Sequence, residues 1–207
     1  MNYNLKMEEM IENIPAGTSL LLHACCAPCS SACLERLANH FKVTIYFYNP
    51  NITEETEYNK RINEVKRFVK EFNTTYSIDV IDGKFNPDKF FAMSKGLENE
   101  PERGIRCYKC YKLRLEGTAI LASKLDFDYF TTTLSLSPYK NSEWINEIGS
   151  ELDNKYESTF LYSDFKKKNG YKRSIELSKE YNLYRQDYCG CIYSKRDRLK
   201  CKINKKS

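Results

Sequence analysis

Six of the nine cysteines in this 207-residue chain form three tight pairs that lie about 80 residues apart. The pairs are Cys25-Cys26, Cys107-x-x-Cys110 and Cys189-x-Cys191, with Cys29 close behind the first pair. Four or more thiolates that converge on one point are the ligands that a soft metal ion or an iron–sulfur cluster requires. Only a folded domain could bring such distant pairs together. The cysteines therefore predict a metalloprotein whose fold makes distant loops meet.

Strand-like and helix-like segments alternate between the cysteine pairs. Short apolar or β-branched runs predict strands at 18–24, 42–48, 75–81, 127–134 and 159–162. Amphipathic or polar segments predict helices at 31–41, 53–72, 87–94, 107–124, 142–154 and 174–181. This alternation is typical of right-handed βαβ units, which build a mostly parallel sheet with helices on both faces. We expect one α/β domain over residues 1–194, followed by a basic tail at 195–207.

The first cysteines should lie at the ligand-binding edge of this sheet. In open α/β sheets, ligands bind outside the carboxyl ends of the strands. Cys25 directly follows the predicted strand at 18–24, and the run 131–134 (TTTL) ends the fourth strand. Both segments should open onto the same edge.

The chain has the features of a cytoplasmic protein. No stretch approaches the 18 apolar residues that a membrane span needs, and residues 1–12 are too polar for a signal peptide. In the reducing cytoplasm, paired cysteines indicate metal ligands or redox catalysts rather than structural disulfides. An odd number of cysteines also argues against a fully disulfide-bonded framework.

The net charge of +5 permits a nucleic-acid partner but does not require one. Many of the basic residues come late in the chain: Lys166, Lys167, Lys168, Lys172, Arg173, Lys195, Arg196, Arg198, Lys200, Lys202, Lys205 and Lys206. A solvated surface with a floppy tail accounts for them, and charge alone favours this simpler interpretation. Binding to a polyanion such as RNA is the more specific interpretation. Sixteen tyrosines add aromatic surface on which bases could stack.

Cys25, Cys26, Cys107 and Cys110 together favour an iron–sulfur cluster. The C-x-x-C pair places two sulfurs one helical turn apart, which suits a cluster, a zinc ion or a redox site. Adjacent cysteines are unusual in structural zinc sites, whose ligands are usually two to four residues apart. A loop after a strand can still direct both thiolates into one site.

Cys189-Gly190-Cys191 has two possible roles. The glycine permits a sharp bend, so that both sulfurs could face the same way. The pair could be a redox-active dithiol, or it could bind a second metal with Cys29 as a third ligand. Buried, inert cysteines are the less favoured alternative. Cys33 and Cys201 lack partners in the sequence and are interpreted as structural or incidental.

The sequence favours neither a histidine ligand nor a nucleotide cofactor. His23 lies inside the first predicted strand, where a satisfied core histidine is the favoured interpretation. The chain contains no Walker motif and no glycine-rich dinucleotide fingerprint. We therefore predict neither ATP nor NAD as a cofactor.

Motifs along most of the chain resemble one enzyme family. They are LLLHACCAPCS at 20–30, YNPNI at 48–52, EYNKR at 57–61, RCYKCYKLRLEGTA at 106–119, TTLSLSPYKN at 132–141 and DFKKKNGYKRSIELSKEYNLYRQDYCGC at 164–191. In register from about Leu20 to Ser194, they resemble the cobalamin-independent epoxyqueuosine reductases of the QueH type. The resemblance implies a Rossmann-like fold akin to the nucleotide α-hydrolases. It also implies reduction of epoxyqueuosine to queuosine in tRNA, the last step of queuosine biosynthesis.

The resemblance further implies a [4Fe-4S] cluster with an adjacent mononuclear iron, and no cobalamin. The family's motifs match Cys25, Cys26, Cys107 and Cys110 as cluster ligands. Its C-x-C pair matches Cys189 and Cys191, which either bind the second metal or cycle through a disulfide. Some members have an acid at the position of Cys29, which suggests a metal ligand there. An unidentified electron donor is also implied.

Two alternatives belong to other functional classes. A tRNA sulfur transferase on the same fold would need a glycine-serine phosphate loop after the first strand, where this chain has Cys25 to Ser30 and no glycine. A non-catalytic zinc module could use the basic tail to hold RNA. Iron and labile sulfide in anaerobically purified protein would distinguish the reductase from the zinc module.

Overall fold

A five-stranded, all-parallel sheet forms the centre of the computed structural model, which describes residues 1–204. The strands are β1 (Ser19–His23), β2 (Lys42–Phe47), β3 (Asp79–Asp82), β4 (Tyr129–Thr132) and β5 (Thr159–Phe160). They are ordered β3-β2-β1-β4-β5, and each neighbouring pair is parallel. The predicted α/β class with a Rossmann-like sheet is confirmed.

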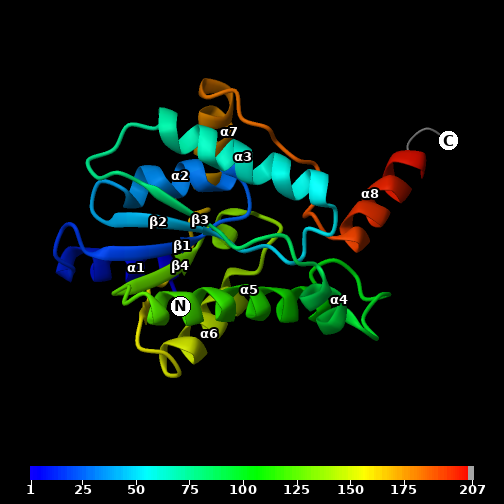
Figure 1. Cartoon of the computed structure of the whole chain (residues 1–207), viewed down its shortest axis with the longest axis horizontal. Helices are drawn as coiled ribbons and strands as arrows, with labels where there is room; N and C mark the ends of the chain where they lie inside the picture. The colour runs from blue at the N-terminus through cyan, green and yellow to red at the C-terminus, as the bar shows by residue number, and fades with distance from the viewer. Residues whose placement is uncertain (205–207) are drawn as a thin grey trace.

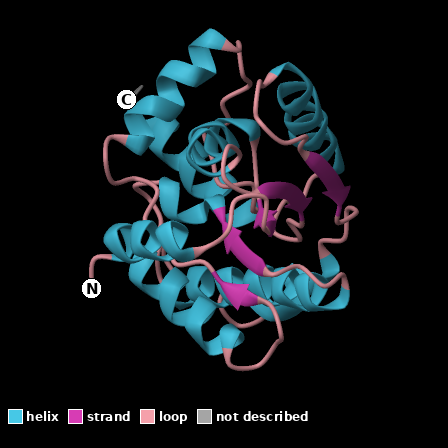
Figure 2. Cartoon of the chain, turned by 90° about the vertical axis from the view of Figure 1, so that its left-hand side faces the viewer, coloured by secondary structure: helices cyan, strands magenta, loops and turns pink. Residues whose placement is uncertain are grey.

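Helices cover both faces of the sheet (Figures 1 and 2). They are α1 (Tyr3–Asn13), α2 (Ala27–Leu37), α3 (Glu55–Glu71), α4 (Asp88–Ser94), α5 (Ile105–Lys124), α6 (Ser142–Asp153), α7 (Gly170–Glu180) and α8 (Ile192–Asn204). In Figure 1, α2, α3 and α7 lie on one side of the sheet, and α5 and α6 lie on the other. The helix α8 stands at one end of the molecule, away from the sheet.

The continuous apolar run of β1 explains this layering. Successive strand residues point to opposite faces, so an all-apolar strand can be buried on both. Leu20 and Leu22 pack in a core that includes Leu34 of α2, whereas Leu21 packs in a second core with Leu115 of α5 and Ile148 of α6. The strand that precedes the first cysteines is therefore fixed from both sides.

The strand order brings several loops together at the end of β1. Both β2 and β4 pair with β1, and His23 lies opposite Tyr46 of β2 and Thr132 of β4. The chain therefore leaves three neighbouring strands at one edge, as expected for the ligand-binding edge of such a fold. A short 3-10 helix, η1 (Thr133–Leu136), follows β4 there.

Some element boundaries differ from the predicted ones. The helix α2 begins at Ala27 rather than at residue 31, because Pro28 is compatible with the first helical turn. The helix α7 also begins four residues early, and β3 and β5 are shorter than expected. Two further helices, α1 and α8, were not predicted. The basic segment expected as a tail from residue 195 is helical as far as Asn204, and residues 205–207 lie outside the described part.

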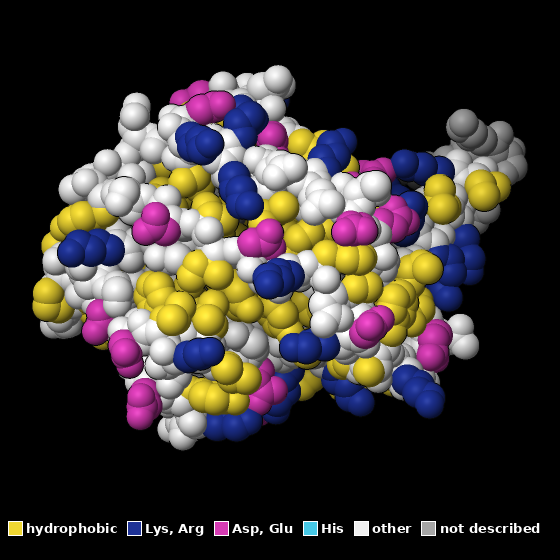
Figure 3. Space-filling model, in the orientation of Figure 1, with side chains coloured by type: hydrophobic (Ala, Val, Ile, Leu, Met, Phe, Trp, Pro, Cys, Tyr) yellow, Lys and Arg dark blue, Asp and Glu magenta, His cyan; other side chains and the backbone are white. Residues whose placement is uncertain are grey.

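The surface carries charges of both signs. On the face shown in Figure 3, lysine and arginine side chains are interspersed with aspartate and glutamate side chains. No helix in the described part of the chain is both long enough and apolar enough to span a bilayer.

Candidate metal centre

The first cysteine group lies in the loop between β1 and α2. Cys25 and Cys26 follow the end of β1, and Cys29 lies in the first turn of α2. Their three Sγ atoms lie within 4.8 Å of one another, and those of Cys25 and Cys26 are 3.9 Å apart. Thiolates that share one tetrahedral metal lie about 3.8 Å apart, as follows from a metal–sulfur bond of about 2.3 Å. The spacing therefore suits convergence on a common metal site.

The second cysteine group is formed by the other two pairs. Cys107 and Cys110 lie on the first turns of α5, and Cys189 and Cys191 immediately precede α8. Cys110 and Cys191 are buried in one small cluster with Phe90. Cys189 interacts electrostatically with both Cys107 and Cys110. The fold thus brings together two pairs that are about 80 residues apart in the chain.

Arg114 links the two cysteine groups. It lies on α5 one turn beyond Cys110, and only 1% of its surface is exposed. Its charge interacts with Cys110, Cys25 and Cys189. Its Nη2 donates to Oδ1 of Asn49 at 2.6 Å, so this hydrogen bond goes to an amide rather than to a carboxylate. A buried cation needs a compensating negative charge, and the cysteine thiolates can supply it.

Arg61 holds the C-G-C segment against α3. Its side chain is also 1% exposed, and its Nε donates to Oε1 of Glu57 at 2.7 Å. Its Nη1 and Nη2 donate to the backbone oxygens of Cys189 and Tyr188 at 3.1 and 3.4 Å. Gly190 has a φ of +116°, a backbone conformation that residues other than glycine rarely adopt. The glycine expected to permit a bend therefore does so, and Arg61 fixes the bend in place.

Lys140 is another basic residue of the site, and it contacts Cys189 directly. Nζ of Lys140 donates to Sγ of Cys189 at 3.1 Å. Lys140 follows η1, and thus comes from the loop after β4 that was expected to open onto this edge. The site therefore combines thiols with two cationic groups, Arg114 and Lys140.

The three thiols of the first group differ in their pKa. Hydrogen bonds from Cys26 and Cys29 hold the pKa of the Cys25 thiol well below its usual range, against the opposing effect of burial. The same hydrogen bond to Cys25 raises the pKa of Cys26 to about 12. Hydrogen bonding to Cys25 and Cys26 raises the pKa of Cys29 well above its usual range. One thiolate is thus stabilised by two neighbouring thiols.

Burial controls the protons of the second group. It raises the pKa of Cys110 to about 11 and that of Cys191 to about 12. The pKa of Cys107 is raised by burial as well. A metal that binds these thiols must displace their protons.

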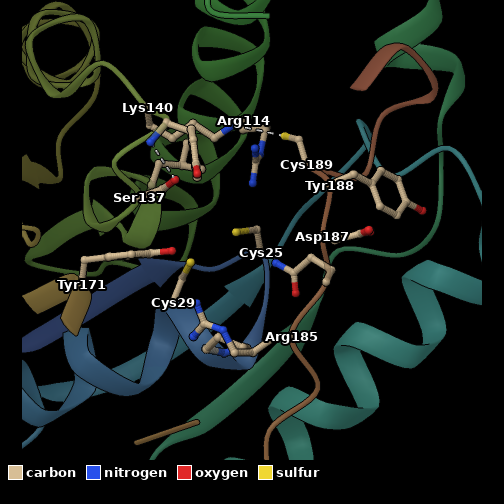
Figure 4. Close-up of a pocket in the computed structure, with 14 residues that line it drawn as sticks. Cys25, Cys29, Arg114, Ser137, Lys140, Tyr171, Arg185, Asp187, Tyr188 and Cys189 are labelled. Atoms are coloured by element: carbon tan, nitrogen blue, oxygen red, sulfur yellow. Dashed lines mark hydrogen bonds between the residues drawn. The ribbon is translucent and has the colours of Figure 1, made fainter. Parts of the chain in front are cut away.

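A cavity of about 170 Å³ opens next to the cysteines. Its lining includes Cys25, Cys29 and Cys189 together with Arg114 and Lys140. Figure 4 shows the sulfurs of Cys25 and Cys29 close together on one side of this cavity and Cys189 on the other. A small molecule or a single chemical group could therefore reach three of the predicted metal ligands.

The residues present fit a thiolate-bound metal cofactor. Soft sulfur ligands favour iron–sulfur clusters or zinc, and the seven predicted ligands lie in two adjoining groups that Arg114 connects. Both side-chain polar atoms of Asn51 are buried without a hydrogen-bond partner among the described residues. Asn51 lies in the loop after β2, and nearby Thr53 donates its backbone N–H to the oxygen of Gly190. Such an unpaired amide next to the C-G-C segment is typical of a site that holds a further group.

The two groups of cysteines in the structure differ from the two predicted sets, the cluster ligands and the ligands of the second metal. The three sulfurs within 4.8 Å of one another combine two predicted cluster ligands, Cys25 and Cys26, with one predicted ligand of the second metal, Cys29. Likewise Cys107 and Cys110 adjoin Cys189 and Cys191. The division into two metal sites therefore remains a prediction.

His23 is a core residue, as expected. Its Nδ1 lies 2.8 Å from Oγ1 of Thr132, and its Nε2 lies 3.0 Å from the backbone oxygen of Tyr48. Burial lowers the pKa of His23 to about 3, so the ring is neutral. Cys33 is fully buried in the first core, and Cys201 is exposed on α8.

Sequence reasoning assigned no role to three basic residues of the site: Arg61, Arg114 and Lys140. A signal for Arg114 exists, because it follows Cys107 and Cys110 at the i+7 and i+4 spacing that keeps residues on one helix face. Arg61 interrupts an otherwise apolar and aromatic face of α3 next to Tyr58 and Ile62. Lys140 carries no such signal.

Fold and site together define an α/β protein with a thiol-rich, cationic pocket at the carboxyl edge of its sheet, whose cysteines could hold a metal. Residues 20–197 match the model of a protein family described as epoxyqueuosine reductase QueH. The epoxyqueuosine reductase QueH of Streptococcus pyogenes serotype M1 is 43% identical over 199 residues, which cover 94% of this chain and 78% of that protein. The QueH of Thermotoga maritima is 36% identical over 182 residues, covering 85% and 90%. The chain belongs to the QueH family.

Proposed function

We propose that this protein reduces epoxyqueuosine to queuosine in tRNA, in the cytoplasm. The observation that carries the proposal is that one cysteine of each pair of a QueH chain, Cys25, Cys110 and Cys189, interacts with the same buried guanidinium, that of Arg114 beside the cavity. The reaction removes the epoxide oxygen as water: two electrons and two protons are consumed, both C–O bonds break, and a C=C bond forms. The site must therefore supply electrons, protons and a place for the departing oxygen.

We further propose a cofactor for each set of cysteines. Cys25, Cys26, Cys107 and Cys110 would hold a [4Fe-4S] cluster, and Cys29, Cys189 and Cys191 would hold an adjacent iron. When bound, the cluster would supply single electrons, and the iron would supply a Lewis acid for the epoxide oxygen. A separate protein or small reductant would deliver electrons to the cluster.

The chain's own residues would assist at the epoxide oxygen. Lys140 and Arg114 line the cavity, and both are cationic. Negative charge develops on an epoxide oxygen as its C–O bond breaks, and fixed positive groups stabilise such charge without reorganising. Lys140 would thus act both on Cys189 and on the oxygen.

The alternative role of Cys189 and Cys191 is a redox couple. Oxidation of two thiols to a disulfide releases two electrons and two protons, which equals the demand of the reaction. Both thiols lie in the segment that Arg61 holds next to the cavity.

Substitution of these two cysteines tests the proposal and separates the mechanisms. We expect Cys189→Ser and Cys191→Ser to abolish conversion of epoxyqueuosine-containing tRNA while the visible spectrum of the cluster remains. Loss of about one iron per chain would indicate a metal ligand, and unchanged iron would indicate a thiol relay. Cys201→Ser, on the exposed face of α8, is the matched control. Full activity in both variants would contradict the role of the pair, and wild-type protein with zinc but no iron would favour the RNA-binding module.

A further inference from the structure

The cavity beside the cysteines adjoins a second hollow, with which it shares part of its lining. This hollow, of about 360 Å³, lies at the base of α8. Four residues line both spaces: Tyr139, Gln186, Asp187 and Tyr188. A ligand that reaches the cysteines from the second hollow must therefore pass these side chains.

Gln186, the single glutamine of the chain, offers an unused acceptor at this passage. Its Oε1 is buried and has no hydrogen-bond partner among the described residues. Buried side-chain oxygens are satisfied in most native structures, and an unsatisfied one is costly unless a ligand or water donates to it. The atom is therefore available to accept a hydrogen bond from a donor group of a ligand.

The segment around Gln186 is fixed, so the acceptor has a defined position. On one side, Nη1 of Arg185 donates to Oγ of Ser178 on α7 at 2.9 Å. On the other side, Asp187 accepts from Nζ of Lys202 on α8 at 2.7 Å. Beyond it, Arg61 holds the backbone oxygen of Tyr188. Three helices thus hold the residues that flank Gln186.

Tyr139 supplies an aromatic surface at the same passage. It is 59% exposed, and the guanidinium of Arg103 lies 5.3 Å from its ring centroid. Exposed aromatic rings are the surfaces on which RNA-binding proteins stack unpaired bases. A phosphate would not satisfy Oε1 of Gln186, because phosphate oxygens only accept hydrogen bonds. A nucleoside has both a flat ring and N–H or O–H donors.

We propose that Gln186 recognises the substrate nucleoside by accepting a hydrogen bond from one of its N–H or O–H groups, while its base stacks on Tyr139. This inference rests on the proposed function, because that function places a modified nucleoside at the cysteines. The cavity beside the cysteines is below the range of about 300–1,000 Å³ typical of drug-sized ligand pockets. It thus admits the reacting ring of one nucleoside and not a longer stretch of RNA.

Binding and kinetics with two RNAs test the inference. Metal-loaded wild type, Gln186→Met and Tyr139→Leu are compared on tRNA that carries epoxyqueuosine and on the same tRNA with guanine at that position. We expect Gln186→Met to raise the KM and the Kd for the epoxyqueuosine tRNA about tenfold, because the ligand's donor loses its partner. Its kcat should change little. Tyr139→Leu should weaken both RNAs about tenfold through lost stacking.

The pattern of loss identifies the donor. Weaker binding of the epoxyqueuosine tRNA alone would place the donor on the modification, and equal weakening of both RNAs would place it on the edge that the two bases share. Wild-type KM and Kd values in Gln186→Met would overturn the inference. Tyr139 is exposed, so its variant remains informative if Gln186→Met fails to fold, and unchanged RNA affinity there would also overturn the inference. A wild-type protein that binds tRNA without reducing it would instead refute the proposed function.

Discussion

At the scale of single residues, Arg114 is the clearest link between the fold and the chemistry. A fully buried guanidinium is rare unless a negative group lies nearby. Its hydrogen bond to Asn49 fixes its direction, and Asn49 in turn donates to the backbone oxygen of Ala24, next to Cys25. The same side chain therefore ties α5, the loop after β2 and the first cysteine group into one network.

Replacing Arg114 should change the electrostatic environment of the proposed [4Fe-4S] cluster. We expect Arg114→Met to lower the reduction potential of this proposed cluster on the order of 100 mV, because a unit charge about 8 Å away contributes about 2 kcal/mol at an effective dielectric near 20. Arg114→Lys should retain much of the potential but lose the fixed hydrogen bond to Asn49. Spectroelectrochemical titration of the reconstituted variants measures the change. Equal potentials in wild type and Arg114→Met would show that the guanidinium has only a packing role.

At the scale of elements, the C-G-C segment depends on its contact with α3. The segment immediately precedes α8, a helix that contributes nothing to the sheet, so its position relies on contacts with other elements. Arg61 provides two hydrogen bonds to its backbone. A Cβ at Gly190 would lie 2.9 Å from Cγ1 of Ile52 and 3.3 Å from Nη1 of Arg61. Both the backbone conformation and the close contacts at this bend therefore favour glycine at position 190.

Gly190→Ala should displace the cysteine pair, and Gly96→Ala is its matched control. Gly96 also has a positive φ, of +79°, but a Cβ there would meet nothing within 4 Å. Backbone strain should destabilise the fold by about 1 kcal/mol in both variants, and the close contacts of the new Cβ should add to this cost in Gly190→Ala. Only Gly190→Ala should also lower activity, by about tenfold or more, since small misplacements of reacting groups are costly. Thermal unfolding and turnover measure both effects, and equal turnover in the two variants would contradict the positional argument.

At the scale of the whole molecule, sequence patterns predicted all five strands and six of the eight helices in the described part of the chain. The continuous apolar run of β1 and the periodic apolar stripe of α3 are strong signals, and both elements end within two residues of the expected positions. The start of α2 was misplaced because the Pro28 that looks like a breaker is acceptable in a first turn. The helix α8 was missed because its dense lysines and arginines indicate a tail as readily as an exposed helix.

The cysteine motifs identified the candidate ligands, but not their surroundings. Adjacent and closely spaced cysteines can be recognised in the sequence itself. Lys140 and Cys189 are far apart in the sequence, and only the folded structure brings them into contact. The same holds for Gln186, whose unpaired oxygen depends on three helices that are distant in sequence. Tertiary contacts of long polar side chains are not encoded by local periodicity, so sequence alone could not reveal them.

The arrangement of the ligands predicts that the metal centre stabilises the whole fold. Cysteines from the loop after β1, from the start of α5 and from the segment before α8 would share the cofactor, which would connect both layers of helices. Binding at about 1,000 times its dissociation constant contributes about 4 kcal/mol, and each kcal/mol raises the Tm of a domain of this size by about 2–4 °C. We therefore expect iron-loaded protein to unfold about 10 °C above iron-stripped protein. Cys25→Ser and Cys110→Ser should narrow this gap, whereas Cys201→Ser should preserve it. Calorimetry under anaerobic conditions measures the gap, and equal unfolding temperatures with and without iron would show that the cofactor is held without supporting the fold.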